Sequence, residues 1–429
     1  MNIVEIIEKK RDKKALTKAE INYFVKEYTK GNIPDYQASA LLMAIYLNGL
    51  NKDEIYELTI SMKNSGKTMN FSRQDLIFAD KHSTGGVGDK TTFLVLPLVS
   101  CCGIFMPKLS GRGLGFTGGT ADKIESVPGF RANLDFGEFE NLLYKNGAVL
   151  ATQTNNLTPA DKKIYALRDV TGTVSSLPLI ASSIMSKKLA INSNIICLDI
   201  KCGSGAFMKT FKEAEELANL MIEIGNSANR KMCAVISDMS QPLGNAVGNS
   251  LEVYEALSAL KTGKPYDLIK LSKTIAELIL KKAGIENAGE IVLEKLRNGE
   301  AYQKLCDIIS SQGGDMDAVL SRDFKRAKFQ KVIYSKQKGY IESINCELIG
   351  KASLYLGAGR MKLGDEIDHK AGIYLYKKVG DFADVDDKLF ELYTSSEERL
   401  IEAEKMALKA YKFSSKMPEK RDVILKIIE

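Results

Sequence analysis

The stretch Leu76–Thr92 reads LIFADKHSTGGVGDKTT and holds the pattern that decides the fold. A brief apolar run, Leu76–Ala79, leads into a glycine-rich turn, and a helical pattern begins near Thr91. Similar short apolar runs, separated by glycine-rich turns or helical patterns, recur at Ile104–Leu109, Ala148–Thr152, Ile195–Ile200 and Cys233–Ser237. This alternation predicts an α/β fold with a mostly parallel sheet flanked by helices.

The sequence on either side of this region has different residue patterns. Residues 1–68 show helix start and stop signals, including a capping box at Thr17 and Glu20, a stop at Gly31 and a start at Pro34, and predict a helical domain. Helical patterns at about 158–192 have no strand between them, so we expect them to join that domain. Residues 69–334 form the predicted α/β domain, and residues 335–429, with short β-like pieces and a charged helix, a C-terminal α+β domain.

Composition limits the partners and the compartment. The 429 residues carry a net charge of +6, with 60 basic and 54 acidic residues interspersed, which argues against a nucleic-acid-binding protein. The longest uncharged stretch, Thr91–Pro107, is too short for a membrane span and predicts a buried helix followed by a strand. Glu5 and Glu8 lie where a signal peptide would need its apolar region, so we expect no export signal. Seven scattered cysteines indicate a reducing cytoplasm.

Two successive glycine-rich turns predict an anion site. Each follows a predicted strand and supplies lysines, hydroxyl groups and backbone N–H groups, which suit phosphate oxygens. Both turns are expected at the carboxyl ends of strands, where sheets of this class bind ligands. The candidate phosphate ligands are Lys81, Ser83, Thr92, Lys108, Ser110 and Thr120. A third turn of similar style runs from Lys201 to Gly205.

Other interpretations of these turns are weaker. Asp89 stands where a Walker loop needs glycine before its Lys-Thr pair. Gly113–Gly118 satisfies the GxGxxG pattern, but Pro128 and Gly129 soon end the helix that a dinucleotide site requires. A tight turn without any ligand remains the alternative.

Longer blocks of the sequence resemble one enzyme family. The blocks KHSTGGVGDK, SGRGLGFTGGTADKIESVPGF, LTPADKKIYALRDVT, IASSIMSKK and SDMSQPLGNAVGNSLEV look like the successive signatures of the pyrimidine-nucleoside phosphorylase and thymidine phosphorylase family. The likeness covers essentially the whole chain, in order. One departure is Phe116, where the family usually has histidine.

The resemblance implies phosphorolysis of a pyrimidine nucleoside (uridine, thymidine or deoxyuridine) to the free base and a pentose 1-phosphate. The turn residues named above would bind phosphate, and Tyr165, Arg168, Ser183 and Lys187 would bind the base. Arg168 and Lys187 would stabilise the anionic leaving group. His82 would donate a proton or a hydrogen bond to the base, or is a structural turn residue.

The resemblance also implies a structural potassium ion and no organic cofactor. Its ligands would be the backbone carbonyls of four residues and the carboxylate of Glu255; the four are Gly88, Lys90, Leu243 and Ala246. An ordinary loop with a solvated Glu255 is the alternative. Members of the family are usually homodimers that associate through the helical domain, and the same is expected here.

Two other functions are compatible with the sequence. An anthranilate-phosphoribosyltransferase-like enzyme has a related fold but uses a magnesium-bound diphosphate leaving group. A nucleotide sensor could keep the scaffold without turnover, and Phe116 is the motif departure in its favour. Lys108 is polar where thymidine-restricted relatives carry an apolar residue, which favours broad pyrimidine specificity.

Overall fold

The computed structural model describes residues 1–113, 115–152, 157–362, 364–419 and 421–429. Leu114, inside the second glycine-rich turn, lies outside the described residues. The chain divides into two compact units. The first comprises Met1–Asp80, Gln153–Ile196 and Glu216–Met232; the second comprises Lys81–Thr152, Cys197–Glu215 and Cys233–Glu429. The domain limits expected at residues 68 and 334 stay predictions.

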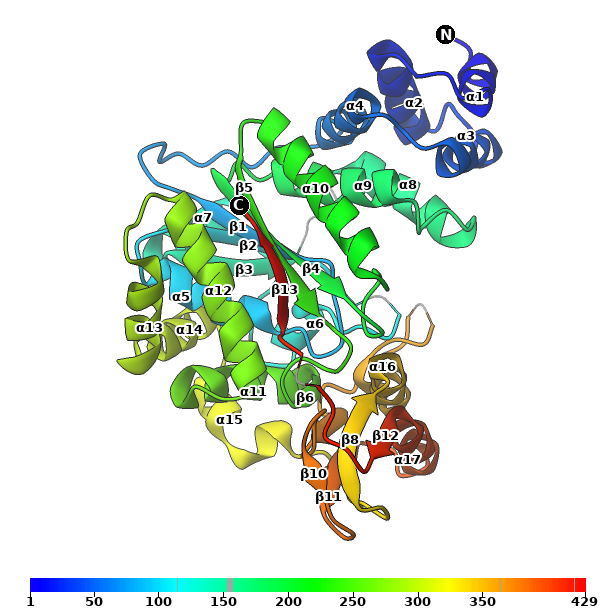
Figure 1. The fold of residues 1–429 in the computed structure, drawn as a ribbon. Coiled ribbons are helices and arrows are strands. Elements are labelled where there is room, and N and C mark those ends of the chain that lie inside the picture. Colours follow the sequence, from blue (N-terminus) through cyan, green and yellow to red (C-terminus); the bar gives the residue numbers. More distant parts are fainter. Residues whose placement is uncertain (114, 153–156, 363, 420) are drawn as a thin grey trace. The chain divides into compact units, whose positions relative to one another are not determined.

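The first unit is mainly a bundle of helices (Figure 1). Its N-terminal helices are α1 (Ile3–Arg11), α2 (Lys18–Lys30), α3 (Asp35–Asn48) and α4 (Lys52–Lys63). Two helices from a later part of the chain share their apolar core, α8 (Pro159–Val170) and α9 (Leu177–Leu189). Side chains such as Phe24, Leu41, Ile164 and Leu179 are buried together, and removal of this apolar surface from water holds the helices in place.

Cap residues explain where these helices begin and end. The Thr17 side chain accepts from the N–H of Glu20, whose carboxylate accepts from the N–H of Thr17, and Asn51 and Glu54 repeat this capping box at α4. Gly31 ends α2 with a φ of 87°, which favours glycine. The predicted start at Thr17 and stop at Gly31 are confirmed.

Most residues of the central strands belong to the second unit. One sheet has the order β1 (Ala79–Ser83), β4 (Ile195–Cys202), β5 (Lys231–Asp238) and β13 (Ile424–Ile428). The C-terminal strand β13 runs antiparallel to β5, beside which it lies in Figure 1. A second sheet pairs β2 (Met106–Ser110) in parallel with β3 (Ala148–Thr152). The predicted α/β class is confirmed.

The first strand begins later than its apolar run predicts. The run Leu76–Ala79 was expected to be the strand, but β1 begins at Ala79 and continues through Lys81 to Ser83. Lys81 is 1% exposed and pairs with Asp199 of β4, so the strand buries charge as well as apolar surface. Apolar runs alone do not reveal such a strand.

Helices surround these strands. In α5 (Thr91–Ser100) every residue is buried, which confirms the predicted buried helix before the second strand. The other helices of this part are α6 (Thr120–Ile124), α7 (Phe136–Asn146), α10 (Phe211–Ser227), α11 (Asn249–Thr262), α12 (Tyr266–Lys282), α13 (Ala288–Arg297), α14 (Glu300–Ser311) and α15 (Met316–Leu320). Residues 216–227 of α10 belong to the first unit.

The C-terminal part adds two antiparallel sheets and two longer helices, as its short β-like pieces and charged helical pattern predict. One sheet has the order β10-β8-β12 and the other β6-β9-β11-β7. Their strands are β6 (Ala246–Gly248), β7 (Phe329–Tyr334), β8 (Gly339–Ile344), β9 (Gly372–Leu375), β10 (Phe382–Ala383), β11 (Lys388–Thr394) and β12 (Tyr411–Ser414), and the helices are α16 (Cys346–Ser353) and α17 (Arg399–Ala410). Because β6 comes from the middle of the chain, it ties this part to the central strands.

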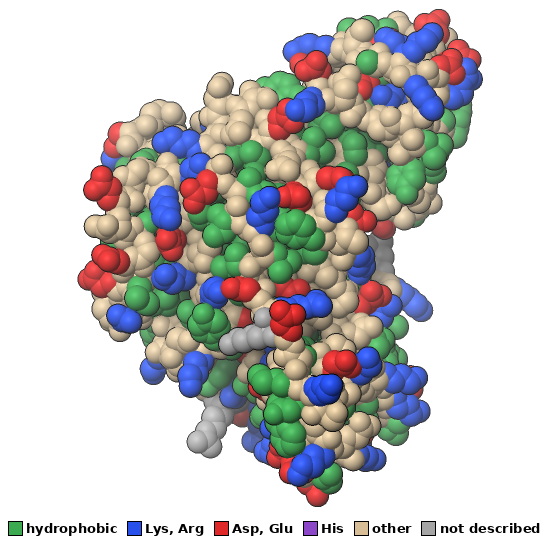
Figure 2. Space-filling model, viewed as in Figure 1, with side chains coloured by type: hydrophobic (Ala, Val, Ile, Leu, Met, Phe, Trp, Pro, Cys, Tyr) green, Lys and Arg blue, Asp and Glu red, His purple; other side chains and the backbone are tan. Residues whose placement is uncertain are grey.

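On the face that Figure 2 draws, Lys and Arg side chains are interspersed with Asp and Glu side chains. Within the described part of the chain, no helix combines the length and the apolar character that crossing a bilayer requires.

Candidate active site

The first glycine-rich turn joins β1 to α5 and gathers paired charges and hydroxyl groups. Lys81 Nζ donates to Thr91 Oγ1 at 2.6 Å and lies 3.4 Å from the Asp199 carboxylate. Ser83 Oγ donates to Asp89 Oδ2 at 2.5 Å, and Thr91 Oγ1 donates to Asp89 Oδ1 at 2.7 Å. Lys81 and Ser83, two of the candidate phosphate ligands, therefore lie in one polar cluster.

The third turn contributes a further lysine to this cluster. Lys201 Nζ lies 2.7 Å from Asp199 Oδ2 and 3.8 Å from Asp89 Oδ1, and its side chain is 0% exposed. Burial alone would raise the pKa of Asp89, but the ammonium groups of Lys201, Lys81 and Lys123 hold that pKa well below its usual range. The Asp89 carboxylate is therefore ionised at neutral pH.

Replacement of Asp89 with asparagine is expected to destabilise the protein at neutral pH by about 3 kcal/mol, because buried lysines lose their counter-charge. The folded-state pKa of Asp89 is depressed, so its contribution is complete above the unfolded pKa of about 3.9 and is lost as pH falls through the folded value. In urea unfolding, the difference between wild type and Asp89→Asn should be constant above about pH 5 and shrink at lower pH.

The exposed Asp386 provides the control for this experiment. Asp386→Asn is expected to change the free energy of unfolding by no more than about 0.5 kcal/mol. A wild-type advantage over Asp89→Asn that grows as pH falls would contradict the assigned charge state of Asp89.

A lysine side chain connects the two strands that lead into the first and second glycine-rich turns. Lys108 Nζ, on β2, donates to the backbone carbonyl of Lys81 at 2.5 Å. The two strands belong to different sheets, so this side chain links them where no shared backbone ladder does. The two lysines expected to bind phosphate therefore lie together.

The remaining candidate phosphate ligands lie on β2, α5 and α6. Ser110 ends β2 and is 6% exposed, and its Oγ has no hydrogen-bond partner among the described residues. Thr92 is buried in the first turn of α5, and Thr120 is the first residue of α6. His82 lies between Lys81 and Ser83 on β1, partly exposed.

The candidate base-binding residues lie in the first unit, on α8 and α9. Asp161, Tyr165 and Arg168 follow at intervals of four and three residues, so they share one face of α8. On α9, Lys187 Nζ donates to Ser183 Oγ at 2.9 Å and to Asp161 Oδ2 at 2.5 Å. Ser183 and Lys187 are therefore in contact, and Asp161 orients the ammonium group.

Arg168 has a structural task that the sequence did not reveal. Its side chain donates to the backbone carbonyls of Thr173, Leu179 and Val174, from Nε at 3.3 Å, Nη1 at 3.1 Å and Nη2 at 2.7 Å. Arg168 is 1% exposed, and burial lowers its pKa to about 10. The remaining guanidinium N–H groups can still serve a ligand, because arginine has five donors.

Tyr165 lies next to this guanidinium. Its ring centroid is 5.8 Å from Arg168 Cζ, and burial together with Asp169 raises the pKa of its phenol. Tyr165 is therefore neutral at physiological pH and presents an aromatic face and a hydroxyl group.

Several polar residues of the two sets were not among the sequence candidates. Asp89, Asp199 and Lys201 join the phosphate set, and Asp161 joins the base set. Lys201 had a detectable signal, since it opens the third glycine-rich turn. Asp161 had a weaker signal, its spacing from Tyr165 and Arg168 on one helix face.

The residues expected to hold potassium come together around a side chain. Lys90 Nζ donates to the carbonyls of Leu243 at 2.9 Å and Ala246 at 2.8 Å, and to Glu255 Oε2 at 2.5 Å. The backbone carbonyl of Lys90, one of the expected potassium ligands, accepts from the N–H of Phe93 at 3.0 Å. A potassium ion and an ammonium group cannot occupy the same three oxygens, so the residues in this arrangement do not fit the ion.

The charge of Lys90 is balanced within this cluster. Burial would lower the pKa of Lys90, but the carboxylates of Glu255 and Glu252 more than offset it, and the pKa is raised. The ammonium group is therefore charged at neutral pH.

Comparisons with known families follow the order of these parts. Residues 4–66 match the helical bundle domain of a glycosyl transferase family, and residues 75–302 match the a/b domain of that family. Residues 340–414 match the pyrimidine nucleoside phosphorylase C-terminal domain.

Curated relatives match nearly the whole chain. Pyrimidine-nucleoside phosphorylase from Staphylococcus epidermidis is 49% identical over 403 residues, 93% of each chain. The chain belongs to the pyrimidine-nucleoside phosphorylase family. The protein of that name from Geobacillus stearothermophilus is 48% identical over 403 residues, again 93% of each chain. The Staphylococcus haemolyticus protein is 47% identical over 402 residues, 92% of this chain and 93% of its own.

A solved structure shows the same fold outside the pyrimidine-nucleoside phosphorylase family. Anthranilate phosphoribosyltransferase from Thermus thermophilus matches with a TM-score of 0.58 and 17% identity, over 71% of this chain and 98% of that chain. At this identity the likeness concerns the fold alone.

Phe116, the departure from the pyrimidine-nucleoside phosphorylase pattern, packs against neighbouring residues. A Cβ atom added to Gly350 of α16 would lie 2.9 Å from the Phe116 ring and 2.9 Å from its carbonyl oxygen, so the two residues are in close contact. Lys209 Nζ lies 5.8 Å from the centroid of the same ring. The phenylalanine therefore packs the second glycine-rich turn against α16.

Proposed function

We propose that this protein cleaves pyrimidine nucleosides with inorganic phosphate, giving the free base and a pentose 1-phosphate. The observation that carries the proposal is the buried lysine cluster at the two glycine-rich turns, where Lys108 meets Lys81 and Lys201 lies by Asp89. Membership of the pyrimidine-nucleoside phosphorylase family supports it.

On the phosphate side, the cluster holds and orients the nucleophile. Lys81, Lys108 and Lys201 carry three positive charges against the two negative charges of Asp89 and Asp199, so these groups together favour an anion. The hydroxyl groups of Ser110, Thr92 and Thr120 donate to phosphate oxygens, and Ser83 joins them when its O–H turns from Asp89 to the phosphate. One oxygen then forms the bond to C1′ as the bond from C1′ to N1 of the pyrimidine breaks. Holding phosphate in this orientation lowers the entropic part of the barrier.

On the base side, cationic groups stabilise the departing pyrimidine. The bonding electrons pass to N1, and negative charge spreads onto the ring carbonyls. Lys187 and the remaining N–H groups of Arg168 donate to those oxygens, and Ser183 binds the imide edge. Asp161 accepts a hydrogen bond from the Lys187 ammonium and orients it. His82 donates a hydrogen bond or a proton to the base as it leaves.

Uridine, thymidine and deoxyuridine are the proposed substrates. Lys108 is polar and its ammonium is bonded to the Lys81 carbonyl, which supports tolerance of a ribose 2′-hydroxyl near the phosphate set. Chromatography of reactions with each nucleoside measures this breadth directly. Thymidine cleavage without uridine cleavage would overturn the broad specificity and leave phosphorolysis itself standing.

The reaction class is tested by incubating the purified protein with uridine, with and without phosphate, and with magnesium or EDTA. Uracil released with phosphate and unaffected by EDTA supports the proposal. Turnover that needs magnesium and a phosphoribosyl diphosphate would favour the phosphoribosyltransferase alternative. Binding of uridine and phosphate without release of uracil would favour a sensor.

Ser110→Ala is expected to raise KM for phosphate about tenfold without lowering Tm. Its buried hydroxyl has no hydrogen-bond partner among the described residues, so its removal costs the protein little, whereas the phosphate loses a charge-assisted hydrogen bond. Ser272→Ala, on α12, is the matched control, because that hydroxyl is buried and lacks a partner in the same way. An unchanged KM for phosphate in Ser110→Ala would remove Ser110 from the phosphate set.

A cytoplasmic homodimer is the proposed working form. The helix α3 carries large exposed apolar side chains, Tyr36 at 74% and Leu47 at 72%, which supports association through this surface. All seven cysteines are free, which supports a reducing compartment. Light scattering during size-exclusion chromatography measures the oligomeric state, and a mass of 47.3 kDa would mean a monomer.

A further inference from the structure

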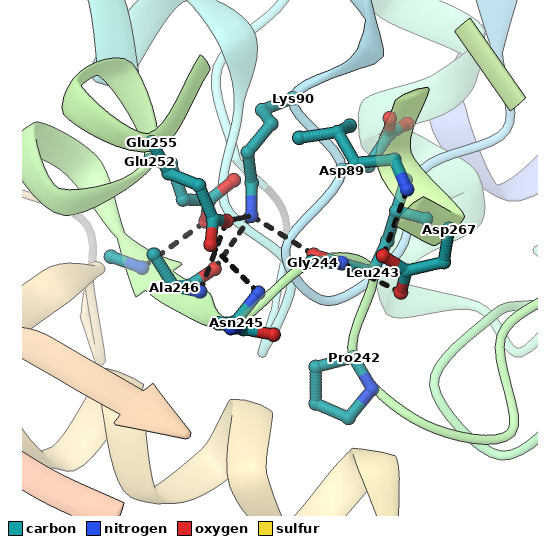
Figure 3. A network of polar contacts seen from close by, with 12 residues as sticks. Asp89, Lys90, Pro242, Leu243, Gly244, Asn245, Ala246, Glu252, Glu255 and Asp267 are labelled. Atoms are coloured by element: carbon teal, nitrogen blue, oxygen red, sulfur yellow. Dashed lines mark hydrogen bonds and ion pairs between the residues drawn. The ribbon is translucent and has the colours of Figure 1, made fainter. Parts of the chain in front are cut away.

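The Lys90 ammonium group lies at the centre of an oxygen cluster in the second unit. Figure 3 shows it directed at the carbonyls of Leu243 and Ala246 and at the Glu255 carboxylate. The Lys90 side chain is 0% exposed and that of Glu255 is 8% exposed. An ammonium group has three hydrogen-bond donors, so these three acceptors satisfy it completely.

The surrounding groups are arranged for one positive charge. Glu255 also accepts from the N–H groups of Asn245 at 2.9 Å and Ala246 at 3.1 Å, which fix both carboxylate oxygens. The nearby Glu252 has its own counter-charge, Lys123, at 2.7 Å. Lys90 and Glu255 thus balance each other, and a second cation would leave an excess of buried positive charge.

The backbone approaches the cluster too closely to leave further room. A Cβ atom on Gly244 would lie 2.5 Å from Glu255 Oε2 and 3.0 Å from Lys90 Nζ. A Cβ atom on Gly88 would lie 2.7 Å from the Leu243 carbonyl oxygen and 3.2 Å from that of Ala246. Gly88 and Gly244 have φ values of 75° and 68°, which also favour glycine.

We infer that the Lys90 ammonium is a built-in monovalent cation, which takes the place of a potassium ion and makes the protein independent of potassium. It joins the start of α5, and therefore the first glycine-rich turn, to residues 243–246 and to α11, which carries Glu255. An exchangeable ion could make the same connection only while bound. Because the Lys90 ammonium is covalently attached to the chain at the turn, the connection does not depend on a bound ion.

Thermal unfolding of the wild-type protein tests this inference without any substitution. The midpoint should be the same in potassium chloride and in choline chloride at equal ionic strength. Crystals soaked in thallium(I), which scatters anomalously, should show no peak between Leu243 O, Ala246 O and Glu255. A potassium-specific, saturable rise in the midpoint, or a thallium peak at that position, would overturn the inference.

Two variants of Lys90 test whether the position is a cation site. Lys90→Ala opens it and should lower the midpoint in choline by roughly 5–10 °C, with recovery in potassium or ammonium chloride. Lys90→Met fills the same space without charge and should be destabilised without recovery. Lys338→Ala, at an exposed lysine, is the control and should respond to neither salt.

The outcomes separate clearly. Recovery of Lys90→Ala, but not of Lys90→Met, by potassium and ammonium supports the inference. A Lys90→Ala protein that is as stable as wild type in choline would contradict it, since the cation would then be dispensable. If neither variant folds, the wild-type measurements still decide, and none of these readouts depends on the proposed reaction.

Discussion

Lys187→Met is expected to lower kcat for uridine phosphorolysis by about 10²–10³-fold, with a smaller change in KM. The ammonium group, held by Asp161 at 2.5 Å and Ser183 at 2.9 Å, is the positioned cation of the base set. Its interaction with the pyrimidine strengthens as negative charge develops, so its loss affects the transition state more than the bound substrate. Steady-state kinetics at saturating phosphate measures the effect.

The acidity of the leaving group separates this role from a structural one. With 5-fluorouridine the departing base is more acidic and needs less stabilisation, so the loss in Lys187→Met should be smaller than with uridine. Lys163→Met is the matched control, because Lys163 on α8 also binds a neighbouring oxygen, the Tyr28 carbonyl, but lies outside the base set. Equal losses with both nucleosides would contradict charge stabilisation by Lys187.

Arg168→Met is expected to destabilise the first unit by about 4 kcal/mol. The substitution leaves the carbonyls of Thr173, Val174 and Leu179 without their buried donor, and each lost hydrogen bond costs about 1–2 kcal/mol. Arg168→Lys should recover little of the loss, because an ammonium group cannot reproduce the planar guanidinium geometry. Hydrogen exchange of amides in α8 and α9 reports this loss locally.

The exposed Arg131 supplies the control for this prediction. It pairs with Glu138 and is 55% exposed, so Arg131→Met should change the stability by no more than about 0.5 kcal/mol. An Arg168→Met protein with wild-type exchange rates in α8 and α9 would show that the three carbonyls do not depend on the guanidinium. Any loss of activity would then be assigned to base binding alone.

Local signals in the sequence were sufficient for much of the fold. The capping box at Thr17 and the glycine stop at Gly31 fix α2, because their hydrogen bonds involve residues close in the chain. The start of β1 was not predictable from its apolar run, since the strand extends through Lys81, whose charge is balanced by Asp199 on β4. The pairing of β13 with β5 was likewise hidden, because it joins distant segments.

In the candidate sites, too, contacts between residues close in the chain were predictable and contacts between distant segments were not. Ser183 and Lys187 are four residues apart on one helix, so their contact followed from spacing. Asp161, Asp199 and Lys201 reach their partners through tertiary structure, and no short-range pattern gave those distances. Lys90 is the clearest case: the sequence indicated its loop, but the direction of a long, flexible side chain depends on the acceptors that Leu243, Ala246 and Glu255 bring to it.

Phosphorolysis is measured directly by ³¹P NMR on the purified protein with uridine and inorganic phosphate. We expect a new pentose 1-phosphate resonance that grows at the expense of phosphate, in equal amount to the uracil released. Uracil formed without the sugar phosphate, or no reaction with any pyrimidine nucleoside tested, would contradict it.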